Sequence, residues 1–299
     1  MCFAKRARRT AGFTLVEVMV ALLIALILSG VVFQLIRGQS RFVTVQSARE
    51  EVQQNTRGAL ELMASELRSI EPGGLVETDS NSVTFLLPRA WGLYCGGSAT
   101  QMSAVFPDFP AEMRALNSAS GVIADTAAAA PRKWGPSPVN AARATVTAIN
   151  TFDLTAAGNA CEGLRPTTIP SPSSQGLRLD GTGLPTPPRG NLVYLYQYVR
   201  YDVAQNDDGE WWIRRSNGMS GGSTVQQPLA GPLPSGGGLR LRYWDGAAGG
   251  QLGPRLTTLA DLGRVGRVSI AVRTRSRSRS GSAVQQQADS LTVLLWNRP

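Results

Sequence analysis

The stretch that decides the fold lies at Phe13–Ile36 and reads FTLVEVMVALLIALILSGVVFQLI. Its 24 residues carry one charge, Glu17. As an α-helix they would extend about 36 Å, enough to cross a hydrocarbon core of about 30 Å. An acidic side chain inside such a segment needs a cationic partner, because an unpaired carboxylate in lipid is costly. We therefore expect a membrane-spanning helix in which Glu17 pairs with a positive charge.

Two simpler interpretations of this segment remain open, a secretory signal peptide and a plain membrane anchor. The apolar run is longer than an ordinary signal-peptide core, and no clear small-x-small cleavage site follows it. A plain anchor would leave the carboxylate unexplained. The residues before the segment would hold the N-terminus in the cytoplasm, because they include four cations and no acid: Lys5, Arg6, Arg8 and Arg9.

The composition excludes several classes of chemistry. The 299 residues include no histidine, which excludes Ser-His-Asp and Cys-His catalytic systems and His-ligated zinc sites. The three cysteines are too widely spaced for a CxxC metal site. Four of the nine net positive charges belong to the N-terminal cations, and the remainder is only a mild basic excess. We therefore expect neither an enzyme nor a cofactor or metal.

The cysteines allow one disulfide. If the chain is cut near residue 12, Cys2 leaves and the pair Cys95 and Cys161 remains. In an oxidising compartment this pair could close a loop of about 65 residues, with a stabilisation of roughly 4 kcal/mol. Two separate buried thiols are the alternative, because sequence does not give the Cα separation that a bridge requires.

The helix is expected to continue beyond the apolar segment. Apolar residues recur at steps of three and four up to Ile70, and Pro72-Gly73-Gly74 ends the pattern. Gly30 and Gly38 are the expected places for a bend or a melted turn. The amphipathic half, residues 37–70, could form a coiled coil, but packing on the protein's own sheet is favoured. The recurring apolar residues form one stripe along this half of the helix, which consists of Val45, Ala48, Val52, Ala59, Leu62, Met63, Leu67 and Ile70.

Residues 71–299 are expected to form a β-rich domain with long loops, which makes the fold class α+β with an antiparallel sheet. Runs rich in β-branched and aromatic residues predict strands. Those at 191–203 and 210–215 are the best hairpin candidate, and the other strands are expected at 82–87, 144–149, 239–244, 267–274 and 290–296. Loops are expected at 118–136, 165–190 and 216–238, which are rich in Ala, Pro and Gly respectively.

Two side-chain patterns within the predicted strands admit a binding function. Alternate positions would place four arginines on one face of an extended strand, where they could contact a polyanion such as DNA: Arg273, Arg275, Arg277 and Arg279. No aromatic residue is interleaved for base stacking, and a solvated hairpin tip is the commoner explanation. An aromatic cluster could bind sugars but is expected to pack across strands: Tyr194, Tyr196, Tyr198, Tyr201, Trp211 and Trp212.

The N-terminal residues also carry a family resemblance. Gly12-Phe13-Thr14-Leu15-Val16-Glu17, after its basic leader, resembles the processing signature of type IV prepilins and type II secretion pseudopilins. The resemblance implies that a prepilin peptidase removes residues 1–12 by cutting after Gly12 and methylates the new N-terminus at Phe13. It also implies that Glu17 serves assembly. A new amine at Phe13 would supply the cation that Glu17 needs.

A weaker resemblance concerns the rest of the chain. The predicted hairpin followed by LRLRYWDG at 239–246 is similar to the C-terminal half of PilW-family minor pilins and J-type pseudopilins, and Asn55-Thr56-Arg57 with Glu66-Leu67-Arg68 is similar to their helix end. Residues 88–190 resemble no known family.

This resemblance implies a minor pilin that primes a type IV pilus and sits near its tip. The chain would be held in the inner membrane by one pass, with a periplasmic domain, before it enters a filament. The implied partners are the peptidase, other minor pilins, the major pilin and the inner-membrane assembly platform, with a tip adhesin as a further candidate. A type II secretion pseudopilin and a tip module that binds a surface or DNA remain alternatives.

Overall fold

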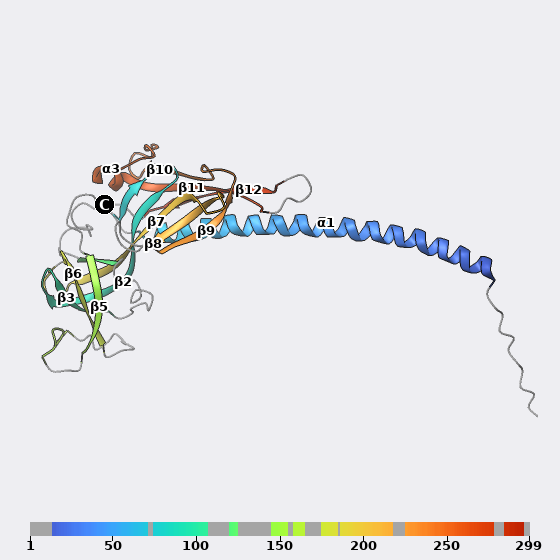
Figure 1. Cartoon of the computed structure of the whole chain (residues 1–299). Coiled ribbons are helices and arrows are strands. Elements are labelled where there is room, and N and C mark those ends of the chain that lie inside the picture. The colour runs from blue at the N-terminus through green and yellow to red at the C-terminus, as the bar shows by residue number, and fades with distance from the viewer. Residues whose placement is uncertain are drawn as a thin grey trace, which may run out of the picture.

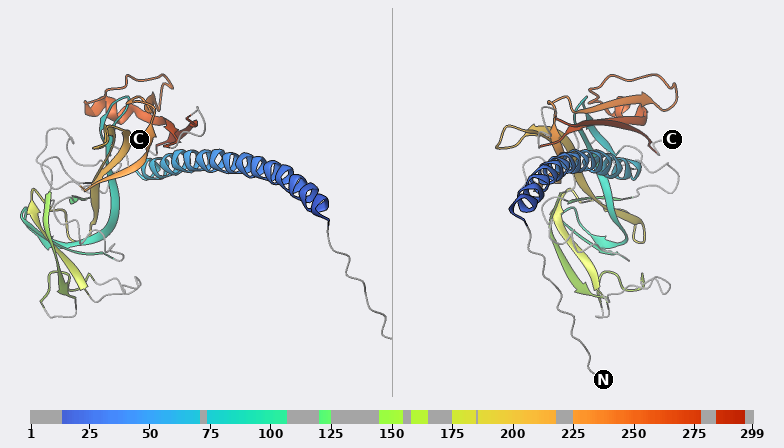
Figure 2. Two further views of the ribbon diagram at one scale, coloured as in Figure 1. Left: turned by 45° about the vertical axis from the view of Figure 1, so that its right-hand side comes forward. Right: turned by 90° about the vertical axis from the view of Figure 1, so that its right-hand side faces the viewer.

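Helix α1, Leu15–Arg68, is one continuous helix of 54 residues (Figure 1). The computed structural model describes residues 14–70, 74–106, 120–124, 145–154, 158–164, 175–184, 186–217, 225–277 and 284–295. The predicted long helix is confirmed. The predicted melted turn is wrong, because the backbone stays helical through Gly30 and Gly38 and the helix only curves gently (Figure 2). A glycine costs only about 1 kcal/mol within a helix, which the flanking turns offset.

Two antiparallel sheets follow the helix. The first has nine strands, and its order is β1-β2-β3-β6-β5-β4-β7-β8-β9 with an additional pairing of β2 with β7. The second has the order β10-β11-β12, and the short helix α3 precedes β11. The bounds are β1 Leu75–Thr78, β2 Val83–Gly97, β3 Gln101–Val105, β4 Ser120–Ala124, β5 Thr145–Asp153, β6 Gln175–Thr182, β7 Leu192–Gln205, β8 Trp211–Asn217, β9 Val225–Leu233, β10 Leu239–Asp245, α3 Leu259–Arg264, β11 Val265–Arg275 and β12 Gln286–Leu294.

Each strand predicted from the sequence overlaps an observed strand, and the predicted β7–β8 hairpin is present with a turn around Asn206. The three tracts expected to be loops are corrected, since each contains a strand: β4, β6 and β9. Strand β9 contains Pro228 and Pro232, which the sheet tolerates because β9 lies at its edge. In β6 the apolar residues Leu177 and Leu179, at alternate positions, are buried.

The second half of α1 shares one core with both sheets, which we call the helix lobe. The helix lies against β9, β11 and β12. Its buried face includes Ala59, Met63 and Leu67, which pack with residues of both sheets, such as Phe85 and Ile270. Fully burying a side chain of the size of Met63 or Leu67 contributes about 1.5–3 kcal/mol. The amphipathic half of the helix therefore packs on the protein's own sheets, as predicted.

A second core lies in a separate lobe, on the side of the molecule where Figure 1 labels β3, β5 and β6. The strand pairings β2–β3–β6–β5–β4–β7–β2 return to their start, so these six strands form a closed ring, which we call the barrel lobe. Its interior includes Met102, Leu179 and Leu195. The ring is built largely from the region between 88 and 190, for which the sequence showed no resemblance.

The two lobes are joined by β2 and β7, which are long enough to run through both. Residues Val83–Pro88 of β2 pair with β7 in the helix lobe, and Ala90–Leu93 pair with it in the barrel lobe. The register shifts between Pro88 and Ala90, which makes Arg89 a β-bulge at the boundary.

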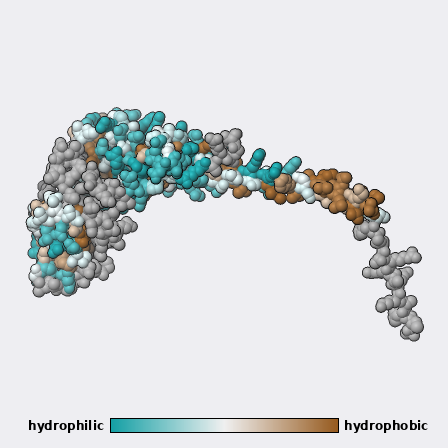
Figure 3. All heavy atoms as spheres, in the orientation of Figure 1, coloured by the Kyte–Doolittle hydropathy of each residue, from teal (hydrophilic) through white to brown (hydrophobic). Residues whose placement is uncertain are grey.

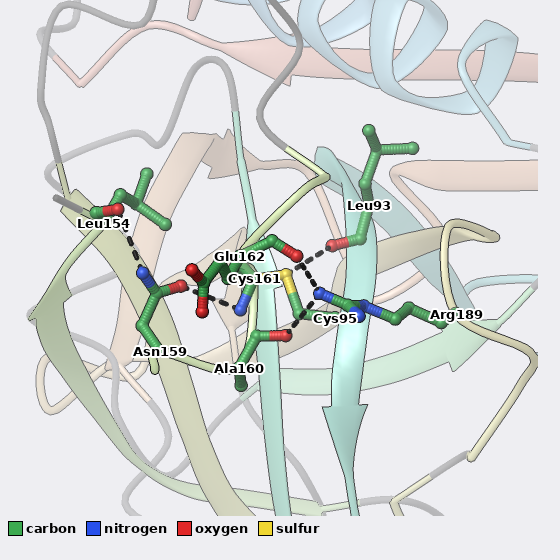
Figure 4. The surroundings of a disulfide bond; sticks show 8 residues. All are labelled: Leu93, Cys95, Leu154, Asn159, Ala160, Cys161, Glu162 and Arg189. Carbon is green, nitrogen blue, oxygen red and sulfur yellow. Dashed lines mark hydrogen bonds between the residues drawn. A yellow bond between two sulfur atoms is a disulfide. The ribbon is translucent and has the colours of Figure 1, made fainter. Parts of the chain in front are cut away.

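A disulfide between Cys95 and Cys161 fastens the barrel lobe (Figure 4). The Cα atoms are 4.7 Å apart, and the bond ties the end of β2 to segment 158–164 across 66 residues. Both cysteines are buried with Val105. Arg189 adds a second tie, because its guanidinium donates to the carbonyl oxygens of Ala160, at 3.2 Å, and Glu162.

Replacing both cysteines in Cys95→Ser/Cys161→Ser should lower the free energy of unfolding of the barrel lobe by roughly 4 kcal/mol, because the unfolded chain regains the entropy of the open loop. Hydrogen exchange of the full chain in detergent would then increase in β3 and β6 and remain unchanged in β11. Cys2→Ser is the control, since it leaves the bond intact. Equal loss of protection in both lobes would contradict a local role for the bond.

Candidate functional site

The first half of α1 exposes apolar side chains on every side. Within Leu15–Ile36 every large apolar residue is at least 47% exposed, and Leu15 reaches 78%. Figure 3 shows this part of the helix as apolar, in contrast to the largely hydrophilic surface over the described part of the helix lobe. The segment is long and apolar enough to cross a membrane, and none of it is buried inside the molecule. An apolar surface of this extent requires lipid or other helices around it.

Thr14 and Glu17 close the N-terminal end of this segment with a capping box. The Thr14 hydroxyl oxygen accepts from the Glu17 N–H at 3.3 Å, and the Glu17 carboxylate accepts from the Thr14 N–H at 3.2 Å. The Thr14 hydroxyl also donates to the carboxylate at 3.2 Å. The carboxylate is therefore at the end of the helix dipole that favours negative charge. The predicted processing residues, Gly12 and Phe13, lie just before this cap and outside the described residues.

The other end of the apolar segment is marked by Arg37. Its guanidinium lies 4.4 Å from the ring centroid of Phe33, so its alkyl stem extends along the helix toward the apolar side. Glu17 and Arg37 are separated by 20 residues, or about 30 Å of helix, which matches the thickness of a hydrocarbon core. The apolar segment is thus bounded by one charge of each sign.

A buried ion pair fastens the other end of α1 to the helix lobe. The carboxylate of Glu66 accepts from Arg215 of β8 at 2.6 Å and 3.1 Å. It also accepts from the Tyr201 hydroxyl of β7 at 2.6 Å. Arg89, the bulge residue, contributes a third contact to Glu66 at 3.9 Å. Both members of the main pair are nine-tenths buried, so the helix end is held by charges that water does not screen.

The environment fixes the protonation of this cluster. Burial, followed by the charge of Glu66 and its hydrogen bond, raises the pKa of Tyr201, so the hydroxyl remains a donor. Burial alone would lower the pKa of Arg215, but the hydrogen bond and charge of Glu66 outweigh it and raise that pKa. Tyr201 and Arg215 therefore keep their protons at neutral pH and donate to the Glu66 carboxylate.

The sequence places Glu66 in a segment that is similar to the helix end of a known family, but it does not indicate the partner of this side chain. The signal that could have found its role is its position, next to Met63, Leu67 and Ile70 on the buried stripe. Toward the N-terminus of α1, on the same helix face, Thr56 is fully buried. Its hydroxyl lies 2.6 Å from that of Thr274 in β11. Both contacts join residues more than 140 positions apart, which local patterns do not show.

The arginines that the sequence predicted on one strand face, at 273–279, differ in their surroundings where the structure describes them. Arg275 and Arg277 both contact Glu210, at 3.4 Å and 3.8 Å, and Arg277 also stacks over Trp212. Arg273 is exposed on the outer face of β11, whereas Arg279 lies outside the described residues. One carboxylate, Glu210, is therefore shared by two of the four arginines that the pattern offered to a polyanion.

The aromatic cluster is divided between the two faces of the nine-stranded sheet, not gathered into one platform. Tyr201 is buried in the core of the helix lobe and stacks on Phe85, with ring centroids 6.0 Å apart. Tyr196 and Tyr198 are buried in another cluster. This arrangement agrees with packing across strands. Among the residues that the structure describes, no three His, Cys, Asp or Glu side chains gather as metal ligands.

Replacing Arg215 by methionine should lower the free energy of unfolding by about 3–5 kcal/mol, because the Glu66 carboxylate is left buried without its charge partner. Arg214→Met is the matched control. Arg214 is the neighbouring residue and pairs with Asp202 at 3.1 Å, but its side chain is 29% exposed. Its loss should therefore cost about 1 kcal/mol or less.

Urea unfolding in detergent would measure both Arg215→Met and Arg214→Met. The double variant Glu66→Gln/Arg215→Met should recover much of the loss, since it removes the unpaired charge. Equal effects of the two single variants would show that the buried pair does not hold the helix end.

Comparison with known proteins gives one match. The family model described as the prokaryotic N-terminal methylation motif matches residues 7–33. These residues include the basic leader's last cations, the capping box and most of the exposed apolar segment. No curated protein and no solved structure matches the chain. The methylation motif, followed by an apolar helix that leads into an antiparallel β domain, supports a type IV pilin-like protein.

Proposed function

We propose that the chain is a minor pilin that takes part in type IV pilus assembly, primes the filament and sits at or near its tip. The observation that carries this proposal is the first half of α1, which is apolar on every side and has no partner within the described chain. Such a helix is suited first to lipid and then to a bundle of similar helices. The protein is thus a substrate of a processing enzyme and not an enzyme itself.

Processing explains the position of Glu17. Cleavage after Gly12 creates an amine at Phe13, which stays positive after a single methylation. In a bundle of helices the Glu17 carboxylate of one subunit is the counter-charge for the amine of its neighbour. The capping box supports this role, because it holds the carboxylate at the very end of the helix, four residues from the new N-terminus.

The topology follows from charge and redox chemistry. The leader's cations keep the N-terminus in the cytoplasm, and Arg37 begins the polar part of the helix on the other side. The two lobes are then periplasmic, where an oxidising environment preserves the Cys95–Cys161 bond. After processing, the protein leaves the inner membrane for the filament through the assembly platform.

The shape supports a terminal position in the filament. The barrel lobe lies at the end of the molecule opposite the apolar half of α1, so it extends away from the helix bundle (Figure 1). Subunits within the body of a filament are covered by the next subunits, whereas a subunit at the tip has room for an additional lobe. A J-type pseudopilin of a type II secretion system has the same structural requirements, and this role is the alternative function.

Processing can be tested directly by mass. The protein, isolated from native membranes or after coexpression with a prepilin peptidase, should begin at Phe13 and carry one added methyl group. Intact mass and the N-terminal peptide would measure both changes. Gly12→Leu should block the cut and is the control. A wild-type chain that still begins near Met1 beside an active peptidase would contradict the proposal.

The role of Glu17 can be separated from its capping role. Glu17→Gln keeps a group that can cap the helix but removes the charge. Thr14→Ala removes the capping hydroxyl, at a cost of about 1 kcal/mol, and keeps the charge. We expect Glu17→Gln to leave cleavage intact and to reduce incorporation into filaments by about tenfold or more, as for the loss of a partly buried charge pair.

Incorporation would be measured as the ratio of protein in sheared filaments to protein in membranes. Thr14→Ala should retain most incorporation. The opposite order, with Thr14→Ala defective and Glu17→Gln normal, would show that helix capping and not charge pairing is the requirement. Glu61→Gln on the exposed face of the second half of α1 is the control for a lost carboxylate.

A further inference from the structure

A groove of about 560 Å³ crosses the outer face of the three-stranded sheet, on the side away from α1. One wall is the β9–β10 connection, with Ser235 and Gly238, and the floor is formed by β10, β11 and β12. The floor is lined by small side chains such as Ser269, Ala271 and Ser290. The groove lies outside the helix, the ion pair and the disulfide that the proposed function uses.

Three arginines project into this groove. In β10, Leu239, Leu241 and Tyr243 are buried while Arg240 and Arg242 are exposed, so both arginines are on the outer face. Arg240 is opposite Ala271 and Arg242 is opposite Ser269 in the neighbouring strand.

Arg273 follows Ala271 by two positions in β11, so it is on the same face and diagonal to Arg240. Diagonal neighbours of this kind are about 7–8 Å apart, which long side chains can span. The three guanidinium groups can therefore converge on one ligand.

The charges of these three arginines are not neutralised within the part of the chain that the structure describes. No carboxylate there lies within ion-pair distance of Arg240, Arg242 or Arg273. Most other arginines on strands contact a carboxylate, whereas Arg267 of β11 stacks over Trp244. Those with a carboxylate partner include Arg178, Arg200, Arg214, Arg215 and Arg275. Repulsion among three neighbouring cations is unfavourable without an anion. The groove thus concentrates the unneutralised charge of the sheet.

We propose that this groove binds an acidic segment of a partner protein, whose carboxylates form bidentate pairs with Arg240, Arg242 and Arg273. Arginine is suited to this task, because its planar group presents parallel donors to a carboxylate. The serines of the groove add hydroxyl donors. The identification of the partner as another subunit of the same assembly rests on the proposed function. The binding site itself does not rest on it.

The geometry favours a short acidic segment over a nucleic acid. Affinity for DNA grows with the number of phosphates contacted, but within the described chain three arginines line the groove, and the next two on this strand face, Arg275 and Arg277, share the Glu210 carboxylate. The groove lining contains no aromatic side chain on which bases could stack.

The test is binding of a fluorescent hexaglutamate peptide to the full-length protein in detergent, measured by anisotropy. Hexaglutamine and single-stranded oligothymidine serve as comparison probes. We expect hexaglutamate to bind more tightly than either and to weaken as salt increases. The variant Arg240→Gln/Arg242→Gln/Arg273→Gln should weaken its binding about tenfold or more, since each charged hydrogen bond lost contributes to the free energy of binding.

The matched control is Arg57→Gln/Arg178→Gln/Arg255→Gln, which removes the same charge from exposed positions outside the groove. It should bind hexaglutamate nearly as the parent does. Equal weakening in both triple variants would show that binding depends on the net charge of the protein and not on the groove, and it would overturn the proposal. Tighter binding of oligothymidine that depends on the groove arginines would assign the site to nucleic acid instead. Neither result depends on whether the protein is cleaved or enters a filament.

Discussion

The first half of α1 is apolar around its whole circumference, whereas the second half is apolar on one side only. Within the residues that the structure describes, no surface of the β domain covers the first half, and the second half is covered by two sheets. One helix must therefore serve two environments, with the change near residues 44–48. The rest of the molecule follows from this requirement, since the sheets must be held firmly to a helix that extends far beyond them.

The contact that meets this requirement is the pairing of Glu66 with its partners, because a buried carboxylate is the group of the helix whose burial costs the most free energy. Glu66 is buried where the cores of the two lobes approach each other, near the bulge at Arg89. Its pairing with Arg215 and Tyr201 joins the helix to the two strands of the β7–β8 hairpin. A displaced helix would leave charges unpaired in an apolar setting. The ion pair thus specifies one position of the helix on the sheets, in addition to any net stabilisation.

Local patterns in the sequence predicted the helix, the β7–β8 hairpin and the position of Glu17, because each depends on residues close together in the chain. The barrel lobe was not predictable in this way. Its ring requires β2 to pair with β7 and β3 with β6, across long separations, and β4 and β6 lie in tracts whose Ala and Pro content indicated loops. The same limit applies to Glu66 and Arg215, which are 149 residues apart. The arginine pattern at 273–279 was visible, but not the Glu210 side chain that neutralises part of it.

Strands β2 and β7 have a mechanical consequence, because each is continuous through both lobes. When a force pulls the barrel lobe away from the helix, the load passes along two peptide backbones and not across an interface of side chains. The hydrogen bonds between these strands lie perpendicular to the pull, so many of them share the load at once. The lobes are joined by continuous strands and therefore cannot part like two docked domains. In the proposed position at the tip of a filament, the barrel lobe would thus transmit traction to the sheets that hold the helix.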